Sequence, residues 1–142
     1  MTKHASITVL TKRYNELIRI TDEVEEALRG SGIKDGLVAV ITQHTTTGIA
    51  VNESLECLES DLEAFLERLV PEDLPYSHAR ILPSYGSTAG NPTGHLKSHL
   101  TGYSALFPLV GGRMLRGSAQ DIYFCEFDGP ALRTINVVIT GD

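Results

Sequence analysis

The chain has 142 residues, which is enough for one domain with a proper hydrophobic core. Its hydrophobic content of 42% and charged content of 21% are those of an ordinary globular protein, and no apolar run reaches the length of a membrane span. The net charge is −6 and the basic residues are dispersed, whereas a nucleic-acid-binding protein normally concentrates them in one footprint. We therefore expect a single domain over residues 1–142, with neither nucleic acid nor membrane as a partner.

The N-terminus and the cysteines indicate a reducing compartment. Residues 1–4 lead straight into an alternating segment, without the apolar stretch of a signal peptide. Cys57 and Cys125 lack a C-x-x-C partner, and two such thiols do not form a disulfide scaffold. We expect both to be small buried hydrophobic residues in a cytoplasmic protein.

The first third of the chain predicts strand, strand, helix, strand. Polar and apolar residues alternate over 5–11, a turn follows at 12–15, and a second strand covers 16–20. A helix then runs from Thr21 or Asp22 to about Arg29, because Asp22 and Glu25 have capping-box spacing and glycines follow at 30 and 32. The continuous aliphatic run at 37–42 predicts a strand covered on both faces.

The clearest element is a helix over residues 55–69. A short strand at 49–51 leads into it through Asn52 and Glu53. Leucines and Phe65 recur at helical spacing, glutamates fall mostly outside that stripe, and Pro71 ends the helix.

Prolines and glycines make 71–94 mainly loop, and the rest of the chain returns to strands. A short helix is expected at 95–100, ended by Gly102, and strands at 105–110, 122–127 and 132–140. Strands on both sides of the helices, without regular β-α-β alternation, predict an α+β fold. It would have a mixed or antiparallel sheet packed with two or three helices.

Three of the five histidines, namely His44, His78 and His95, lie at strand ends or in loops, where sites form on a rigid scaffold. Imidazole is a common zinc ligand, and three protein ligands with one open position make a catalytic zinc centre. Such a centre activates water or polarises a substrate oxygen. The alternative is that each histidine is an ordinary surface or hydrogen-bonded residue, and spacing alone does not show that the three converge.

His95 and His99 share a helix face, as in the H-E-x-x-H metalloprotease pattern, but Leu96 stands where the catalytic glutamate belongs. We therefore interpret His99 as a solvated residue or as support for a ligand.

Three acidic residues are candidate catalytic groups. Glu53 follows the strand after the His44 loop, so it is placed to orient a histidine or act as a base, or else to stabilise the start of the next helix. Asp61 lies at the edge of the apolar helix stripe, where an inward carboxylate needs a partner. Glu126 interrupts an apolar strand, as a buried site residue or as an exposed one near the strand end.

Hydroxyl groups and backbone amides suited to anions occur at residues 45–48 and 117–120, and Lys97 and Arg133 supply positive charge. Neither segment matches a Walker or dinucleotide fingerprint, so the sequence is compatible with phosphate binding but contains no motif that predicts it.

An ordered set of residues that spans nearly the whole chain resembles the pattern of the YjbQ family, often labelled secondary thiamine-phosphate synthase. The residues that carry the resemblance are Gln43-His44-Thr45-Thr46, Asn52-Glu53, Asp61, Pro71, Tyr76-x-His78, Asn91-Pro92, His95-Leu96-Lys97, Gly102-x-Ser104, Pro108, Gly112-Arg113, Gly117-x-x-Gln120, Glu126 and Arg133.

The resemblance implies a compact α+β domain that assembles as a homotrimer, with a polar site around His44, His78 and His95. It implies convergence of these three on a metal or an anion, with zinc favoured as the divalent metal. The residues expected to contact a small anionic or phosphorylated metabolite are Thr45, Thr46, Asn52, Asn91, Lys97, Ser118 and Gln120.

Three functions compete at this stage. The family label implies a transferase that joins a pyrimidine pyrophosphate to a thiazole phosphate, a reaction that normally calls for Mg²⁺. The histidines suggest instead a metal-dependent hydrolase of a small anionic metabolite. A trimeric metal- or ligand-binding protein without catalysis is the third.

Two positions depart from the family pattern. Ala119 replaces the tryptophan of Gly-Thr-Trp-Gln, and Ala131 replaces the first arginine of Gly-Pro-Arg-x-Arg. Both changes bear on the substrate that this member accepts.

Overall fold

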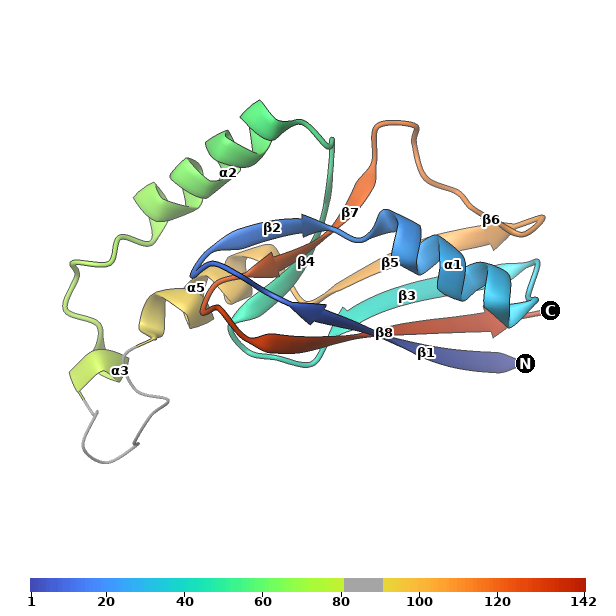
Figure 1. Cartoon of the computed structure of the whole chain (residues 1–142), viewed down its shortest axis with the longest axis horizontal. Coiled ribbons are helices and arrows are strands. Elements are labelled where there is room, and N and C mark those ends of the chain that lie inside the picture. Colours follow the sequence, from blue (N-terminus) through green and yellow to red (C-terminus); the bar gives the residue numbers. More distant parts are fainter. Residues whose placement is uncertain (81–90) are drawn as a thin grey trace.

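The computed structural model describes residues 1–80 and 91–142, which form an α+β domain with two antiparallel sheets (Figure 1). Because the expected loop at 71–94 includes 81–90, that part of the prediction lies outside the described residues.

The larger sheet has five strands in the order β1-β8-β3-β5-β6. Their bounds are Thr2–Leu10 for β1, Leu132–Gly141 for β8, Gly36–Thr42 for β3, Ser104–Val110 for β5 and Arg113–Met114 for β6. Alternate residues of β3, β5 and β8 are fully buried on one face only. The opposite face of β3 includes Leu37, which is 43% exposed, so the expectation of a strand covered on both faces is wrong within one chain.

The smaller sheet has the order β2-β7-β4, with β2 at Glu16–Arg19, β7 at Asp121–Glu126 and β4 at Thr47–Asn52. One face of β7 places Ile122 and Phe124 in the main core between the two sheets. The other face places Tyr123 and Cys125 in a second apolar cluster, which Leu66 of the next helix joins.

Helix α1 (Thr21–Ser31) buries Val24 and Leu28 in the main core. The predicted capping box is wrong, because Ile20 occupies the N-cap position and Asp22 pairs with Arg19 across 3.0 Å. Gly32 ends the helix with a left-handed φ of 71°, a conformation that glycine adopts at low cost.

Helix α2 (Glu56–Leu69) forms where the periodicity predicts it, yet none of its residues is buried. It stands over the outer face of the smaller sheet (Figure 1), and its apolar stripe stays partly open, with Phe65 48% exposed. Cys57 on this helix is exposed, so the expectation of two buried cysteines holds only for Cys125.

Two helices follow, α3 (Ser77–Arg80) and α5 (Pro92–Thr101). Helix α5 packs close to the smaller sheet because a glycine stands at the contact on each side. A Cβ at Gly94 of α5 would lie 2.9 Å from the carbonyl oxygen of Phe127, and a Cβ at Gly48 of β4 would lie 2.7 Å from Cγ2 of Thr101. Among the described residues, no helix is long and apolar enough to cross a membrane.

Candidate functional site

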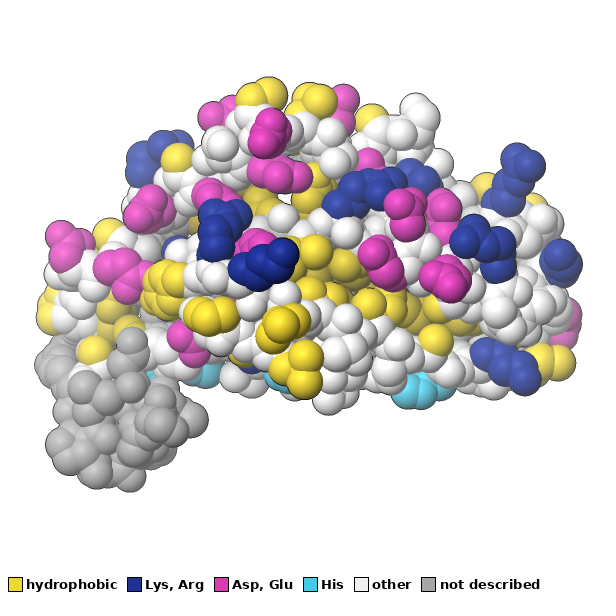
Figure 2. Space-filling model, in the orientation of Figure 1, with side chains coloured by type: hydrophobic (Ala, Val, Ile, Leu, Met, Phe, Trp, Pro, Cys, Tyr) yellow, Lys and Arg dark blue, Asp and Glu magenta, His cyan; other side chains and the backbone are white. Residues whose placement is uncertain are grey.

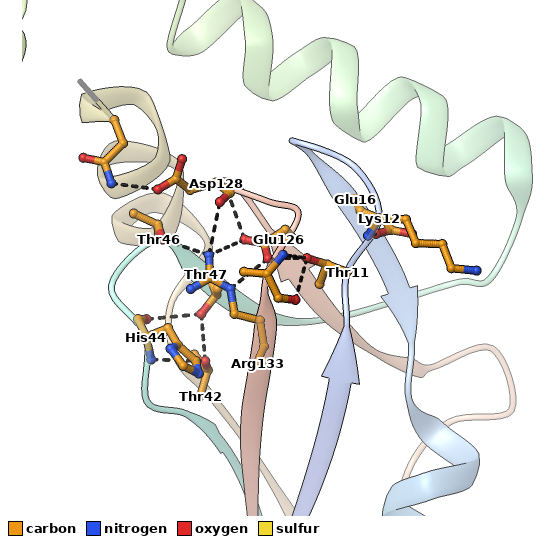
Figure 3. A network of polar contacts seen from close by, with 12 residues as sticks. Thr11, Lys12, Glu16, Thr42, His44, Thr46, Thr47, Glu126, Asp128 and Arg133 are labelled. Carbon is orange, nitrogen blue, oxygen red and sulfur yellow. Dashed lines mark hydrogen bonds and ion pairs between the residues drawn. The ribbon is translucent and has the colours of Figure 1, made fainter. Parts of the chain in front are cut away.

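A buried ion pair joins the two sheets. Glu126 is in phase with Ile122 and Phe124 on β7, so the two-residue period of the strand turns it into the interior, where it is 0% exposed. Arg133 on β8 donates two hydrogen bonds to the Glu126 carboxylate, from Nε to Oε1 at 2.8 Å and from Nη2 to Oε2 at 2.7 Å (Figure 3). This two-pronged geometry is the strongest form of carboxylate recognition.

Further donors complete the coordination of the Glu126 carboxylate. Thr11 donates its hydroxyl to Oε1 at 2.7 Å, and the Asp128 amide donates to Oε2 at 3.1 Å. Burial by itself raises the pKa of Glu126, but the hydrogen bonds from Arg133, Thr11 and the Asp128 amide outweigh it and hold the pKa below its ordinary value. The carboxylate is therefore ionised and fully engaged, which makes Glu126 a positioning group.

His44 lies beside this ion pair, just past the end of β3 (Figure 3). Its Nε2 accepts a hydrogen bond from the backbone amide of Thr134 at 3.0 Å. Burial first, and then the positive charge of Arg133, lower the pKa of His44. The ring is thus held neutral with its proton on Nδ1, so it offers a hydrogen-bond donor on that side.

A second polar chain fixes the start of α5. Nε2 of His78 lies 2.9 Å from Oδ1 of Asn91, and Nδ2 of Asn91 donates to Asp128 at 2.8 Å. The rings of His78 and His95 meet edge to face, with centroids 5.1 Å apart. Asn91 therefore links the histidines of α3 and α5 to the segment that follows Glu126.

A cavity of about 680 Å³ opens where the end of β3 meets α5. Its walls are Thr42, Gln43, His44, Thr45, His95, Ser98, His99, Gly102 and Tyr103. We call it the histidine pocket. None of these lining residues is acidic, although the chain has a net charge of −6. Figure 2 shows histidine side chains along the lower margin of the molecule.

Several predicted residues meet at this pocket. His44, Thr45 and His95 line it, and Thr46 lies just behind, where its hydroxyl accepts from Arg133 at 3.2 Å. His78 contacts the ring of His95 but lines a neighbouring cavity of about 350 Å³.

Other predicted residues do not come together with the pocket. Asn52 pairs with Asp121 at the far end of β4, whereas Thr47, near the pocket, pairs with Glu126. Five residues of extended strand span about 17 Å, so Asn52 and the exposed Glu53 do not approach His44 as expected.

Three more predicted positions are exposed and lie apart from the pocket, and a fourth is buried elsewhere. Asp61 is exposed on α2, so it does not face inward as expected. Ser118 and Gln120 lie in the exposed loop before β7, at the strand end opposite Glu126, where Gln120 accepts from the amide of Gly117 at 2.7 Å. Lys97 is buried on the face of α5 that points away from His95 and His99.

Within the described parts of the chain, no three His, Cys, Asp or Glu side chains form a group that could hold a metal ion. The bond from Thr134 also occupies the Nε2 lone pair of His44. Among the described residues of one chain, His44, His78 and His95 thus do not form the three-ligand centre that the sequence predicts.

Sequence reasoning missed some of the site. Thr11 lies just after β1, far from Glu126 in sequence, and no local pattern marks it as a partner of Glu126. His99 lines the pocket instead of being merely solvated, and its spacing of four residues from His95 was the available signal.

Comparison with known families matches residues 5–142 to the UPF0047 family of YjbQ-like proteins. The chain belongs to this family. A UPF0047 protein of Methanothermobacter thermautotrophicus is 40% identical over 92% of this chain and 87% of its own length. YugU, a UPF0047 protein of Bacillus subtilis, is 35% identical over 96% of this chain and 98% of its own.

Solved structures of the family share the fold. A YbjQ-like protein of unknown function from Sulfolobus solfataricus superposes with a TM-score of 0.93 at 31% identity, covering 100% of this chain and 99% of its own. A hypothetical protein from Aeropyrum pernix gives a TM-score of 0.89 at 34% identity, covering 99% of each chain. The comparisons thus confirm the predicted family and the α+β fold.

Proposed function

We propose that the histidine pocket binds a small phosphorylated metabolite and that the protein is an enzyme acting on it. The observation that carries the proposal is the composition of the wall. It has three imidazoles, several hydroxyls and an amide, and no carboxylate. Such a wall presents hydrogen-bond donors to an anion without like-charge repulsion.

The roles of the side chains follow from their bonds. Neutral His44 presents its Nδ1 proton to a phosphate oxygen, because its other nitrogen is held by Thr134. Thr45 and Ser98 add hydroxyl donors. His95 and His99 are placed to transfer protons to and from the bound molecule, as histidines do in general acid–base catalysis. The Glu126–Arg133 pair holds the His44 loop through Thr46.

The binding test uses inorganic phosphate and pyrophosphate as probes in isothermal titration calorimetry. We expect His95→Ala and His99→Ala to weaken binding by tenfold or more, since each removes a donor that faces the anion. Arg68→Ala is the control, because Arg68 is an exposed hydrogen-bond donor on α2 and does not line the pocket. If neither probe binds the wild-type protein, the proposal is wrong.

The reaction itself needs a separate assay. The transferase predicted from the family resemblance, with Mg²⁺ brought by the pyrophosphate, is tested by following thiamine phosphate formation. A rate equal to that of His95→Ala would exclude it, and hydrolysis of phosphorylated metabolites would then be the reaction to assay.

A bound metal is a second candidate, and the observation in its favour is the contact between the His78 and His95 rings. Two imidazoles at this separation can share a zinc ion once a further ligand is supplied. Zinc binding that disappears in both His78→Ala and His95→Ala would support it, and zinc analysis of untagged protein measures it.

We further propose that the chain assembles as a homotrimer through the outer face of the larger sheet. The strand register sets Val138, Ala39 and Leu106 in one row across β8, β3 and β5. Leu106 is 64% exposed. An apolar row of this kind on an open sheet face favours a protein partner. Light scattering should give three times the chain mass, and Leu106→Lys should reduce it.

A further inference from the structure

A buried lysine on the far side of α5 has less than its full set of partners. Lys97 is only 2% exposed, and its ammonium donates to Oδ1 of Asn15 at 3.3 Å. No carboxylate of the described residues forms an ion pair with it. An ammonium has three protons to donate, and burying it without a counter-charge is costly. Lys97 thus has the capacity to bind an anionic group.

Lys97 and Asn15 line a cavity of about 320 Å³ between α5, α2 and the turn after β1. We call it the lysine pocket. Its lining residues differ entirely from those of the histidine pocket. Asn15 already accepts from Lys97, so its amide nitrogen is left to donate toward an anion beside the ammonium.

The other charges select the kind of anion. Glu63 on α2 is paired with Arg13 at 3.2 Å, whereas Glu16 and Glu67 also line the pocket and form no ion pair within the described chain. Two carboxylates repel a phosphate dianion more than a single carboxylate. Among anions, a monocarboxylate is therefore repelled less in this pocket than a phosphate dianion.

An apolar groove of about 310 Å³ adjoins the lysine pocket, since both are lined by Leu17 and Leu66. Its remaining walls are Ala50, Leu62, Phe65, Leu69, Leu100, Thr101 and Cys125. Apolar side chains are visible between α2 and the strands beneath it (Figure 2). The groove explains why α2 has a clear apolar stripe and yet no buried residue.

We propose that the lysine pocket and this groove together form a binding site for a medium-chain fatty carboxylate. The carboxylate pairs with the Lys97 ammonium and accepts from the Asn15 amide, and the alkyl chain lies in the groove between α2 and the smaller sheet. The ligand thereby supplies the counter-charge of Lys97 and covers the apolar stripe of α2. This site is independent of the phosphate site on the opposite face of α5.

Calorimetric titration with hexanoate, octanoate and decanoate tests the proposal on the wild-type protein. Each methylene buried in the groove should lower Kd about fourfold. Octanol and octylammonium, which share the chain but lack the carboxylate, should bind at least tenfold more weakly than octanoate. Equal binding of octanol and octanoate would overturn the role of Lys97.

Variants separate the two halves of the site. Lys97→Met keeps the length of the buried side chain and should weaken octanoate binding by tenfold or more, whereas Lys12→Met, on the exposed turn nearby, should leave it unchanged. Phe65→Ser, at a half-exposed position outside the two buried apolar clusters, should flatten the dependence of Kd on chain length.

The competing occupant of the groove is a second copy of the chain. If octanoate does not bind, and Phe65→Ser lowers the oligomeric mass in sedimentation, the groove is a subunit interface and the proposal is wrong. Phosphate titration of the same variants keeps the outcome distinct from that of the histidine pocket, because both Lys97→Met and Phe65→Ser should leave phosphate binding unchanged.

Discussion

The Glu126–Arg133 ion pair and the histidine pocket lie side by side, yet their polar groups are used in opposite ways. Around the ion pair, both carboxylate oxygens have protein donors and Glu126 is fully buried. In the pocket, His44 has one nitrogen held and presents the other, and His99 is exposed. Saturated groups position a site, whereas groups with remaining hydrogen-bonding capacity act on a ligand. Changes at the ion pair should thus lower stability first, and changes in the pocket should lower binding first.

Arg133→Met should have the largest effect on stability. It leaves the buried Glu126 carboxylate without its counter-charge, which costs about 3–5 kcal/mol of unfolding free energy. Urea denaturation measures the loss. The double variant Glu126→Leu/Arg133→Met should be more stable than Arg133→Met, because no buried charge is left unpaired. Arg13→Met is the control, since its pair with Glu63 is largely exposed and should cost less than about 1 kcal/mol.

Acid should weaken the same ion pair without any mutation. The pKa of Glu126 is lower in the folded state than in the unfolded chain, so the unfolded state binds more protons as the pH falls. The stability that the Glu126 carboxylate contributes is fully present above the ordinary carboxyl pKa, and it is lost as the pH drops through the lowered pKa of the folded state. Urea midpoints between pH 7 and pH 3 should fall more steeply for the wild type than for the double variant; parallel curves would contradict this.

Gly94→Ala should displace α5 and so lower both the stability of the fold and the affinity of the histidine pocket. Its Cβ would lie 2.9 Å from the Phe127 carbonyl oxygen and 3.3 Å from Cβ of Thr46. Overpacking of this kind costs about 1–3 kcal/mol, and here it should also weaken phosphate binding, because α5 carries His95 and His99. Gly30→Ala is the control: it lies in α1 with open space around it, and should stabilise the protein by about 0.5–1 kcal/mol. An unchanged melting temperature in Gly94→Ala would show that α5 is free to shift.

The smallest effect should come from protonation of His44. Its pKa is lower in the folded state, so its contribution to stability is present above the ordinary histidine pKa and is lost as the pH falls through the lowered value. The difference in melting temperature between pH 7.5 and pH 5.5 should therefore be smaller in His44→Gln than in the wild type. A difference of the same size would mean that His44 is not held neutral.

Local sequence patterns predicted the helices and strands themselves better than they predicted what packs around each of them. The alternation in β1 and the leucine spacing of α2 depend only on neighbours along the chain, and both elements form close to their expected bounds. The burial of α2 depends on what lies beneath it, so the same spacing wrongly suggested an inward Asp61. Likewise Asn52 and Glu53 follow the His44 loop in sequence, but the length of β4 carries them to the other end of the smaller sheet.

The sequence by itself identified the α+β class and the family and put forward His44 and His95 as candidate site residues, because residue order and side-chain chemistry carry that information. Only the tertiary structure decided which groups meet. It joined Thr11, just after β1, to Glu126 of β7, brought His99 into the pocket and turned Lys97 away from it. Strand register and helix phase set these meetings, and both are fixed by packing between segments far apart in the chain.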